Sequence, residues 1–157
     1  PDSPTRWKKL LDDVPDMPPR QREYVEQQVQ RATPIDIRVC DDGIIASWMD
    51  REPQTTAWIR AHGRVGDDDP NLHRCIVAYA SDFQLLGTAL KPHGYAPDRV
   101  RMMASLDHSM WFHGPAFRAD EWLLYEIQSP ASGDNRGFSL GRLYRQDGTL
   151  VVSVAQE

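Results

Sequence analysis

The segment DDDPNLHRCIVAYASDFQLLGTAL, residues 67–90, decides the fold class. Three aspartates followed by Pro70 are typical of a helix start, because an aspartate side chain caps free backbone N–H groups and proline is tolerated in the first turn. Apolar residues then recur at three- and four-residue intervals as far as Leu90. The spacing predicts one long helix from about Pro70 to Leu90, ending before Pro92 and Gly94.

The sequence on both sides of this helix has the alternation of β-strands. Residues 35–39 alternate apolar and polar side chains, and residues 56–65 do so more loosely. Four strand-like runs follow the helix, at 100–113, 122–129, 137–144 and 149–157. Gln146-Asp147-Gly148 is a tight hairpin signal between the last two runs. The order predicts an α+β domain in which an antiparallel sheet wraps around one long helix.

The first 33 residues have a different character. Ser3 as an N-cap and Pro4 in the first turn predict a short helix over residues 3–11. Three prolines then interrupt the chain, and residues 20–32 form a mostly polar helix with a thin apolar stripe. That helix either packs by one edge or binds a partner. We expect residues 1–33 to be a linker or appendage and residues 34–157 to be the folded domain.

Composition excludes several classes of partner. The 157 residues carry a net charge of -5, so nothing resembles a basic footprint for nucleic acid. No apolar run approaches the roughly 18 residues that span a bilayer. Two cysteines, Cys40 and Cys75, provide no disulfide framework and favour a reducing, intracellular compartment. Because the chain begins at Pro1 and stops directly after an apolar run, we expect a fragment of a longer protein.

Helical phase directs attention to Asp82. The predicted helix has one strongly apolar face, formed by Leu72, Cys75, Ile76, Tyr79, Phe83, Leu86 and Leu90. Asp82 falls among residues that widen this face, whereas His73 lies on the opposite half, and Cys75 reads as a core residue. A carboxylate in an apolar sector either caps a loop or pairs with an arginine, or it is a catalytic acid or base. Both interpretations of Asp82 stay open on the pattern alone.

Other catalytic arrangements are disfavoured. Ser105, Asp107 and His108 are too close together on a predicted strand to assemble a hydrolase triad, and no Gly-x-Ser-x-Gly elbow is present. The five histidines show no ligand spacing with cysteines or acids, so we expect no zinc and no other metal site.

Several ordered blocks resemble the type II acyl-CoA thioesterases, a family that includes bacterial thioesterase II and the peroxisomal acyl-CoA thioesterases. The blocks are ASDF at 80–83, SLDHSMWFH at 105–113, FRADEWLLY at 117–125 and QDGTLVV at 146–152. The family has two hotdog domains in one chain, each an antiparallel sheet around a long helix. The resemblance covers about residues 34–157 and implies the second hotdog domain of such a protein. Ala116 is an extra residue relative to the family pattern.

The resemblance also implies a site. The family's catalytic aspartate falls on Asp82, its hydroxyl residue on Ser105 and its glutamine on Gln156. A hydroxyl and an amide can hold a water by hydrogen bonds, and a carboxylate can accept its proton. The implied activity is hydrolysis of fatty acyl-CoA to free fatty acid and coenzyme A, with no cofactor.

Two other functions remain as alternatives: a hotdog enoyl hydratase or dehydratase, and a non-catalytic acyl-CoA-binding module. The resemblance further implies pairing with a second hotdog domain, either the absent N-terminal half or another copy in a homo-oligomer. The expected location is intracellular, peroxisomal in a eukaryote and cytoplasmic in a bacterium.

Overall fold

The computed structural model describes residues 2–40, 52–66, 69–93, 100, 102–114 and 116–157. Its helices are α1 (Ser3–Asp13), α2 (Pro19–Gln30), α3 (Pro70–Ser81) and α4 (Leu85–Leu90), followed by one 3₁₀ turn, η2 (Lys91–His93). Its strands are β1 (Ile35–Val39), β2 (Gln54–Ala61), β3 (Ser109–Phe112), β4 (Leu123–Gly133), β5 (Arg136–Tyr144) and β6 (Leu150–Gln156). Within the described residues, no helix has the length and apolar character needed to cross a membrane.

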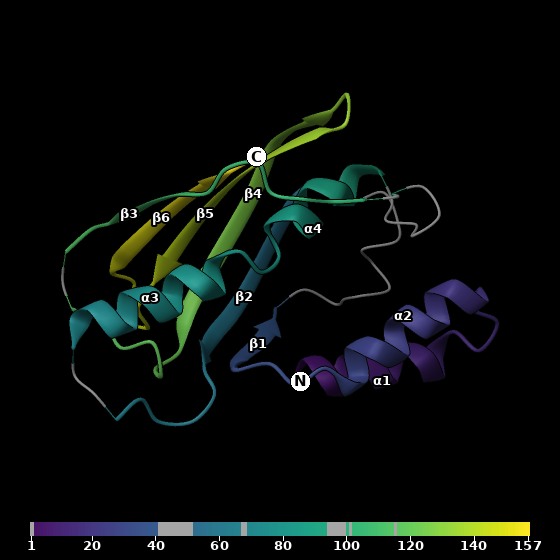
Figure 1. The fold of residues 1–157 in the computed structure, drawn as a ribbon, viewed down its shortest axis with the longest axis horizontal. Coiled ribbons are helices and arrows are strands. Elements are labelled where there is room, and N and C mark those ends of the chain that lie inside the picture. The colour runs from purple at the N-terminus through teal and green to yellow at the C-terminus, as the bar shows by residue number, and fades with distance from the viewer. Residues whose placement is uncertain (1, 41–51, 67–68, 94–99, 101, 115) are drawn as a thin grey trace.

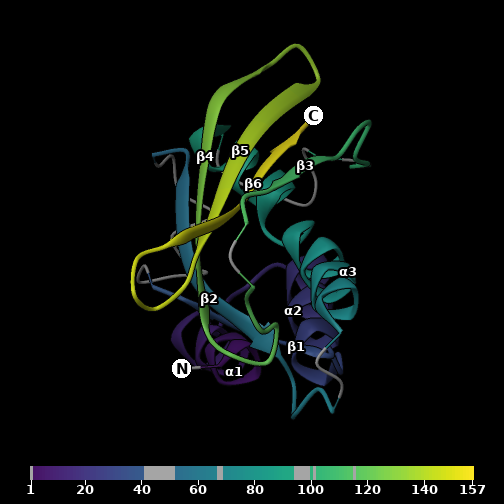
Figure 2. The same cartoon turned by 90° about the vertical axis from the view of Figure 1, so that its left-hand side faces the viewer.

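The strands form one antiparallel sheet in the order β1-β2-β4-β5-β6-β3. Helices α3 and α4 lie on one face of this sheet, as two perpendicular views show (Figures 1 and 2). The prediction of an α+β layer with an antiparallel sheet is therefore confirmed. The predicted hairpin also forms, because Gly148 adopts φ 84° and its N–H donates to the Arg145 carbonyl at 2.9 Å.

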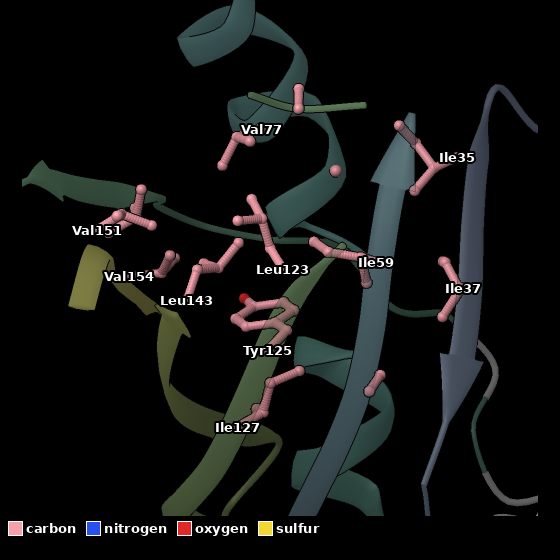
Figure 3. Close-up of a cluster of buried hydrophobic side chains, with 14 of the residues drawn as sticks. Ile35, Ile37, Ile59, Val77, Leu123, Tyr125, Ile127, Leu143, Val151 and Val154 are labelled. Atoms are coloured by element: carbon pink, nitrogen blue, oxygen red, sulfur yellow. The ribbon is translucent and has the colours of Figure 1, made fainter. Parts of the chain in front are cut away.

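The hydrophobic core lies between the helices and the sheet (Figure 3). Val77 and Leu85 project from the helices onto Leu123, Tyr125 and Leu143 of the central strands, and all five are at most 2 % exposed. Alternate residues of β2, β4 and β6 are buried, which is the pattern of strands covered on one face. This packing fixes where the ends of α3 and β6 lie.

The single long helix predicted over residues 70–90 is wrong. It is interrupted after Ser81, and Gln84 takes the left-handed conformation with φ 77° before α4 begins. Apolar residues continue at helical spacing through the interruption, so the sequence pattern does not reveal it. The start of the helix is as predicted, since the Asp69 carboxylate accepts from the Asn71 N–H at 2.9 Å.

The predicted strand over residues 100–113 is also mostly wrong. Of its described residues, only 109–112 form a strand, β3. Residues 102–108 run beside the end of β6 without strand structure. The Leu106 N–H there donates to the Glu157 carbonyl at 2.7 Å, and the Asp107 carboxylate accepts from the Glu157 N–H at 2.9 Å. These contacts with Glu157 take the place of the regular backbone hydrogen bonds that a longer β3 would make with β6.

Helices α1 and α2 pack against each other beside β1 (Figure 1). Their own small core consists of Leu10, Met17 and Val25, so the apolar stripe of α2 is used against α1. The N-cap of α1 is Asp2 rather than the predicted Ser3, because the Asp2 carboxylate is the group that accepts from the Thr5 N–H. The Ser3 hydroxyl instead donates to the Ile37 carbonyl at 3.1 Å and ties α1 to β1.

Candidate active site

Asp82 follows the last residue of α3 and is exposed. Its position is held by the preceding residue, whose carbonyl accepts a 2.7 Å hydrogen bond from the buried hydroxyl of Tyr125. Burial raises the pKa of the Tyr125 phenol, and the nearby Asp82 carboxylate raises it further, so the hydroxyl keeps its proton and stays a donor. A core side chain thus anchors the end of the helix from which Asp82 projects.

Gln156 is the last residue of β6 and its side chain is almost fully buried, with the residue only 1 % exposed. It shares the buried parity of Val152 and Val154. Ser105 lies in the irregular segment that precedes β3, not on a strand as predicted. The hydrogen bonds between residues 106–107 and Glu157 hold this segment against the end of β6.

The three residues that the resemblance implies for the site come together in one hydrogen-bonded chain. The Gln156 Nε2 donates to the Ser105 Oγ at 2.9 Å, and the Ser105 hydroxyl donates to the Asp82 Oδ1 at 3.2 Å. They come from separate parts of the fold: a helix end, an irregular segment and a strand end. The result is an exposed carboxylate that is hydrogen-bonded to a hydroxyl, which is in turn hydrogen-bonded to a buried amide.

A fourth residue, His108, belongs to this network, although the sequence pointed to it only as part of a disfavoured triad. Its Nδ1 is hydrogen-bonded to the Gln156 Oε1, and its Nε2 lies 2.8 Å from the Ser81 Oγ. On a regular strand, His108 and Asp107 would point to opposite faces of the sheet. The register of β3 on β6, with Ser109 opposite Ala155 and Met110 opposite Val154, continues to place His108 opposite Gln156, so the two side chains share one face.

The predicted surroundings of Asp82 need correction. Asp82 does not lie in a buried apolar sector, because the buried side of α3 consists of His73, Val77, Ala80 and Ser81. His73, predicted on the polar half, is 2 % exposed, and its Nδ1 accepts from the Ala119 N–H at 3.0 Å. Cys75, predicted to be core, is exposed. Within α3 the predicted apolar face is instead turned outward, since Leu72 and Tyr79 are also exposed.

A cavity of about 810 Å³ lies next to the network. Met102, Met103 and Leu106 from the segment around Ser105 line it, together with Leu86 and Leu90. Glu157, which follows Gln156, lies on its wall. One wall of the cavity is therefore apolar, whereas the other is polar and includes the Arg136–Glu157 ion pair.

The chemistry open to this site is that of a positioned water. The carboxylate accepts one hydrogen bond from Ser105 and has further lone pairs for a water molecule. The Gln156 amide nitrogen carries two hydrogens, of which the contact to Ser105 uses one. Across the described residues, His, Cys, Asp and Glu side chains form no group of three suited to a metal ion.

Comparison with known proteins assigns the fold and the family. A family model described as acyl-CoA thioesterase matches residues 49–157. The chain is 45 % identical over 143 residues to acyl-coenzyme A thioesterase 8 of Mus musculus, a match that covers 91 % of this chain and 44 % of that protein. It is 36 % identical over 103 residues to acyl-CoA thioesterase 2 of Haemophilus influenzae, covering 64 % and 35 % respectively. The chain thus spans about half the length of the curated relatives it matches, or less.

Solved structures agree with these matches. An acyl-CoA thioesterase II from Mycobacterium marinum superposes with a TM-score of 0.66 at 41 % identity, covering 78 % of this chain and 48 % of that one. A hot dog fold protein from Alicyclobacillus acidocaldarius superposes with a TM-score of 0.58 at 16 % identity, covering 82 % and 45 %, which bears on the fold alone. The predicted hotdog fold is confirmed, with two helices in place of one.

Proposed function

Because the chain belongs to the acyl-CoA thioesterase family, we propose that it carries the water-activating residues of an enzyme that hydrolyses fatty acyl-CoA to free fatty acid and coenzyme A. The observation that carries this proposal is the hydrogen-bonded chain from Gln156 through Ser105 to Asp82. The apolar wall of the neighbouring cavity suits a fatty acyl chain and supports the same substrate.

In the proposed mechanism Asp82 is the general base. Its carboxylate takes a proton from a water molecule that the Ser105 hydroxyl and the Gln156 amide help to position. The water oxygen attacks the thioester carbonyl carbon and forms a tetrahedral intermediate. The carbon–sulfur bond then breaks, the acid is released, and the thiolate of coenzyme A takes up the proton that Asp82 accepted. No covalent acyl-enzyme is needed.

The exposure of Asp82 fits this role, since the base must meet both solvent water and substrate. The alternative hydratase chemistry uses a direct Asp/His pair. Here His108 hydrogen-bonds Gln156 and Ser81, and its link to Asp82 runs through Gln156 and Ser105. That geometry favours hydrolysis over hydration.

The test is release of free thiol from acyl-CoAs of several chain lengths by the full-length protein. Asp82→Asn keeps the shape of the side chain and removes the proton acceptor, so kcat should fall roughly 10²–10⁴-fold. Asp12→Asn, at an exposed aspartate of α1, is the matched control and should leave kcat unchanged. Ser105→Thr should be mild because the hydroxyl survives, whereas Ser105→Ala and Gln156→Ala should both lower kcat.

Other outcomes would identify the alternatives. Near-normal kcat in Asp82→Asn would rule out the general-base assignment. Tight binding of acyl-CoA without thiol release would indicate a binding module, and addition of water to an enoyl-CoA would indicate a hydratase.

We also propose that a second hotdog domain packs against this one. Large apolar side chains are exposed on α3 and on β3, where Tyr79 and Trp111 are each 53 % exposed and Leu72 39 %. Strand β3 ends the strand order of the sheet. Surface of this kind marks an interface. The covering domain is either the other half of a longer chain or another copy of this one in a homo-oligomer.

We also propose a domain boundary at residue 34. The cluster of Leu10, Met17 and Val25 is separate from the core of the sheet, which supports residues 1–33 as an appendage and 34–157 as the hotdog domain.

We propose an intracellular location, peroxisomal if the source is a eukaryote and cytoplasmic if it is a bacterium. Cys40 and Cys75 are both free thiols, which suits a reducing compartment. Imaging of the tagged full-length protein against a compartment marker tests it.

A further inference from the structure

His108 connects the end of α3 to the end of β6. Its Nε2 lies 2.8 Å from the Ser81 Oγ, and its Nδ1 is hydrogen-bonded to the Gln156 Oε1. The imidazole touches neither Asp82 nor Ser105 in these contacts. Its contribution to the reaction therefore passes through Gln156 or through Ser81, the residue before Asp82.

The hydrogen bonds around Gln156 decide which hydrogens the imidazole carries. The amide nitrogen of Gln156 donates to Ser105, so the amide oxygen faces His108. An amide oxygen can only accept a hydrogen bond, and the His108 Nδ1 must then be the protonated nitrogen. A neutral imidazole in this tautomer has an unprotonated Nε2, which accepts from the Ser81 hydroxyl.

We propose that His108, with Ser81 behind it, is a positioning residue that fixes the orientation of the Gln156 amide in the thioesterase site. The proposal rests on the proposed function, because it assigns His108 to the reaction of that same site. With the amide nitrogen held toward Ser105, the Ser105 hydroxyl is free to donate to the Asp82 carboxylate at 3.2 Å.

Loss of the imidazole would allow the opposite orientation. If the amide rotates by half a turn, its oxygen faces Ser105 and competes with Asp82 for the single hydroxyl hydrogen. The chain of donors that ends on the carboxylate is then broken, and the amide hydrogens no longer face the water. The consequence falls on turnover rather than on substrate binding, because His108 acts on the groups that hold the water.

Ser81 lets the arrangement tolerate protonation of the imidazole. The Ser81 Oγ also lies 2.8 Å from the Ala78 carbonyl. When Nε2 carries a hydrogen, the Ser81 hydroxyl can accept from it and donate to that carbonyl instead. Both protonation states keep a hydrogen on Nδ1, so the orientation of Gln156 is the same in each.

The first test reads the hydrogen on Nδ1 directly. Long-range ¹H–¹⁵N spectra of the full-length protein, labelled with ¹⁵N-histidine, distinguish the two tautomers, and His108→Asn assigns the signal by its absence. At pH 8, where an ordinary histidine is neutral, we expect His108 with its hydrogen on Nδ1. An unprotonated Nδ1 would overturn the proposal, and this measurement needs neither activity nor a stable variant.

The second test uses kinetics with a conservative rescue. His108→Asn retains an N–H donor near the position of Nδ1, and His108→Leu does not. We expect kcat to fall roughly 10–100-fold in His108→Leu, by analogy with the loss of an outer-shell partner that orients a metal ligand, with KM within about twofold. His108→Asn should recover most of that loss. The control is His62→Leu, whose histidine also bonds through Nδ1, to Asp36 at 3.1 Å, outside the site.

Equal losses in the two His108 variants, or kcat in His108→Leu no lower than in His62→Leu, would overturn the positioning role. Failure of the proposed function gives a different result. In that case Asp82→Asn keeps its kcat whatever His108 does, whereas an inactive Asp82→Asn beside a fully active His108→Leu refutes the positioning role alone.

Discussion

The variant Gly141→Ala should destabilise the protein, because Gly141 of β5 lies directly against the ring of Tyr125. A Cβ atom at this position would lie 2.5 Å from the Tyr125 Cε2, 2.7 Å from its hydroxyl oxygen and 3.0 Å from its Cζ. Comfortable contact between carbon atoms needs about 3.5–4 Å, so the ring or the strand must move by roughly 1 Å.

Moving either the Tyr125 ring or strand β5 costs free energy. Tyr125 is fully buried and its hydroxyl bonds the Ser81 carbonyl at 2.7 Å, while Gly141 is paired with Ile127 and Val154 on the strands beside it. Overpacking costs about 1–3 kcal/mol, and leaving the Ser81 carbonyl without its partner costs about 1–3 kcal/mol more. The lower entropy of alanine in the unfolded chain offsets about 0.4–1 kcal/mol. We expect the free energy of unfolding to fall by about 1–6 kcal/mol.

Urea denaturation followed by tryptophan fluorescence measures this loss. Gly133→Ala, on β4, is the matched control, because a Cβ there meets no atom within 4 Å and its stability should change by less than about 0.5–1 kcal/mol. Combining Gly141→Ala with Tyr125→Leu should cost less than the sum of the single changes, since the smaller side chain leaves room. A Gly141→Ala protein as stable as the Gly133→Ala control would refute the argument. Movement of the Ser81 carbonyl should also lower kcat, because Asp82 is the next residue.

Two further predictions concern pH and assembly. Hydrogen bonds from Arg118 hold the pKa of the Asp120 carboxyl at about 2, below its usual 3.8. A carboxyl whose pKa is lowered by folding stabilises the folded state at pH values above its unfolded pKa, so Asp120→Asn should be less stable than the parent at pH 7. In urea titrations at each pH, the difference in stability should shrink below about pH 4 and be largely gone near pH 2. A constant difference across that range would contradict this assignment. For assembly, Trp111→Lys should weaken the pairing of residues 1–157 with a second hotdog domain at least tenfold in sedimentation at micromolar concentrations, as truncation of a central interface aromatic does. A 1–157 chain that stays monomeric there, with full thioesterase activity, would contradict the pairing.

The parts of the fold that could be predicted from sequence are those set by local chemistry. The Asp69 cap, the turn at Gly148 and the alternation in β4, β5 and β6 all follow from side chains acting on their own backbone or facing one core. The interruption after Ser81 could not be predicted in this way. Leu85 and Leu86 continue the helical spacing across it. The residue with left-handed backbone is Gln84, and it is neither a glycine nor a proline, the residues that usually signal a helix break.

In the candidate site, too, some features could be predicted from local sequence and others could not. Gln156 faces the buried side of β6 together with Val152 and Val154, an alternation that is readable from the sequence. The contribution of His108 could not be predicted, because it depends on the pairing of β3 with β6, whose register places residue 108 opposite Gln156. His108 and Gln156 are 48 positions apart in sequence. A pattern read along the chain has no access to such a contact.

The separation in sequence between the members of the site has a consequence for the order of folding. Ser105 and Gln156 are 51 positions apart, and Asp82 and Ser105 are 23 apart. Closing loops of this length costs entropy before any contact repays it, so such contacts form slowly relative to a local hairpin. The β5–β6 hairpin can therefore be complete while the network is still open. In refolding experiments, recovery of thiol release should lag behind recovery of β-structure, and the lag would report when residues 102–108 join the end of β6.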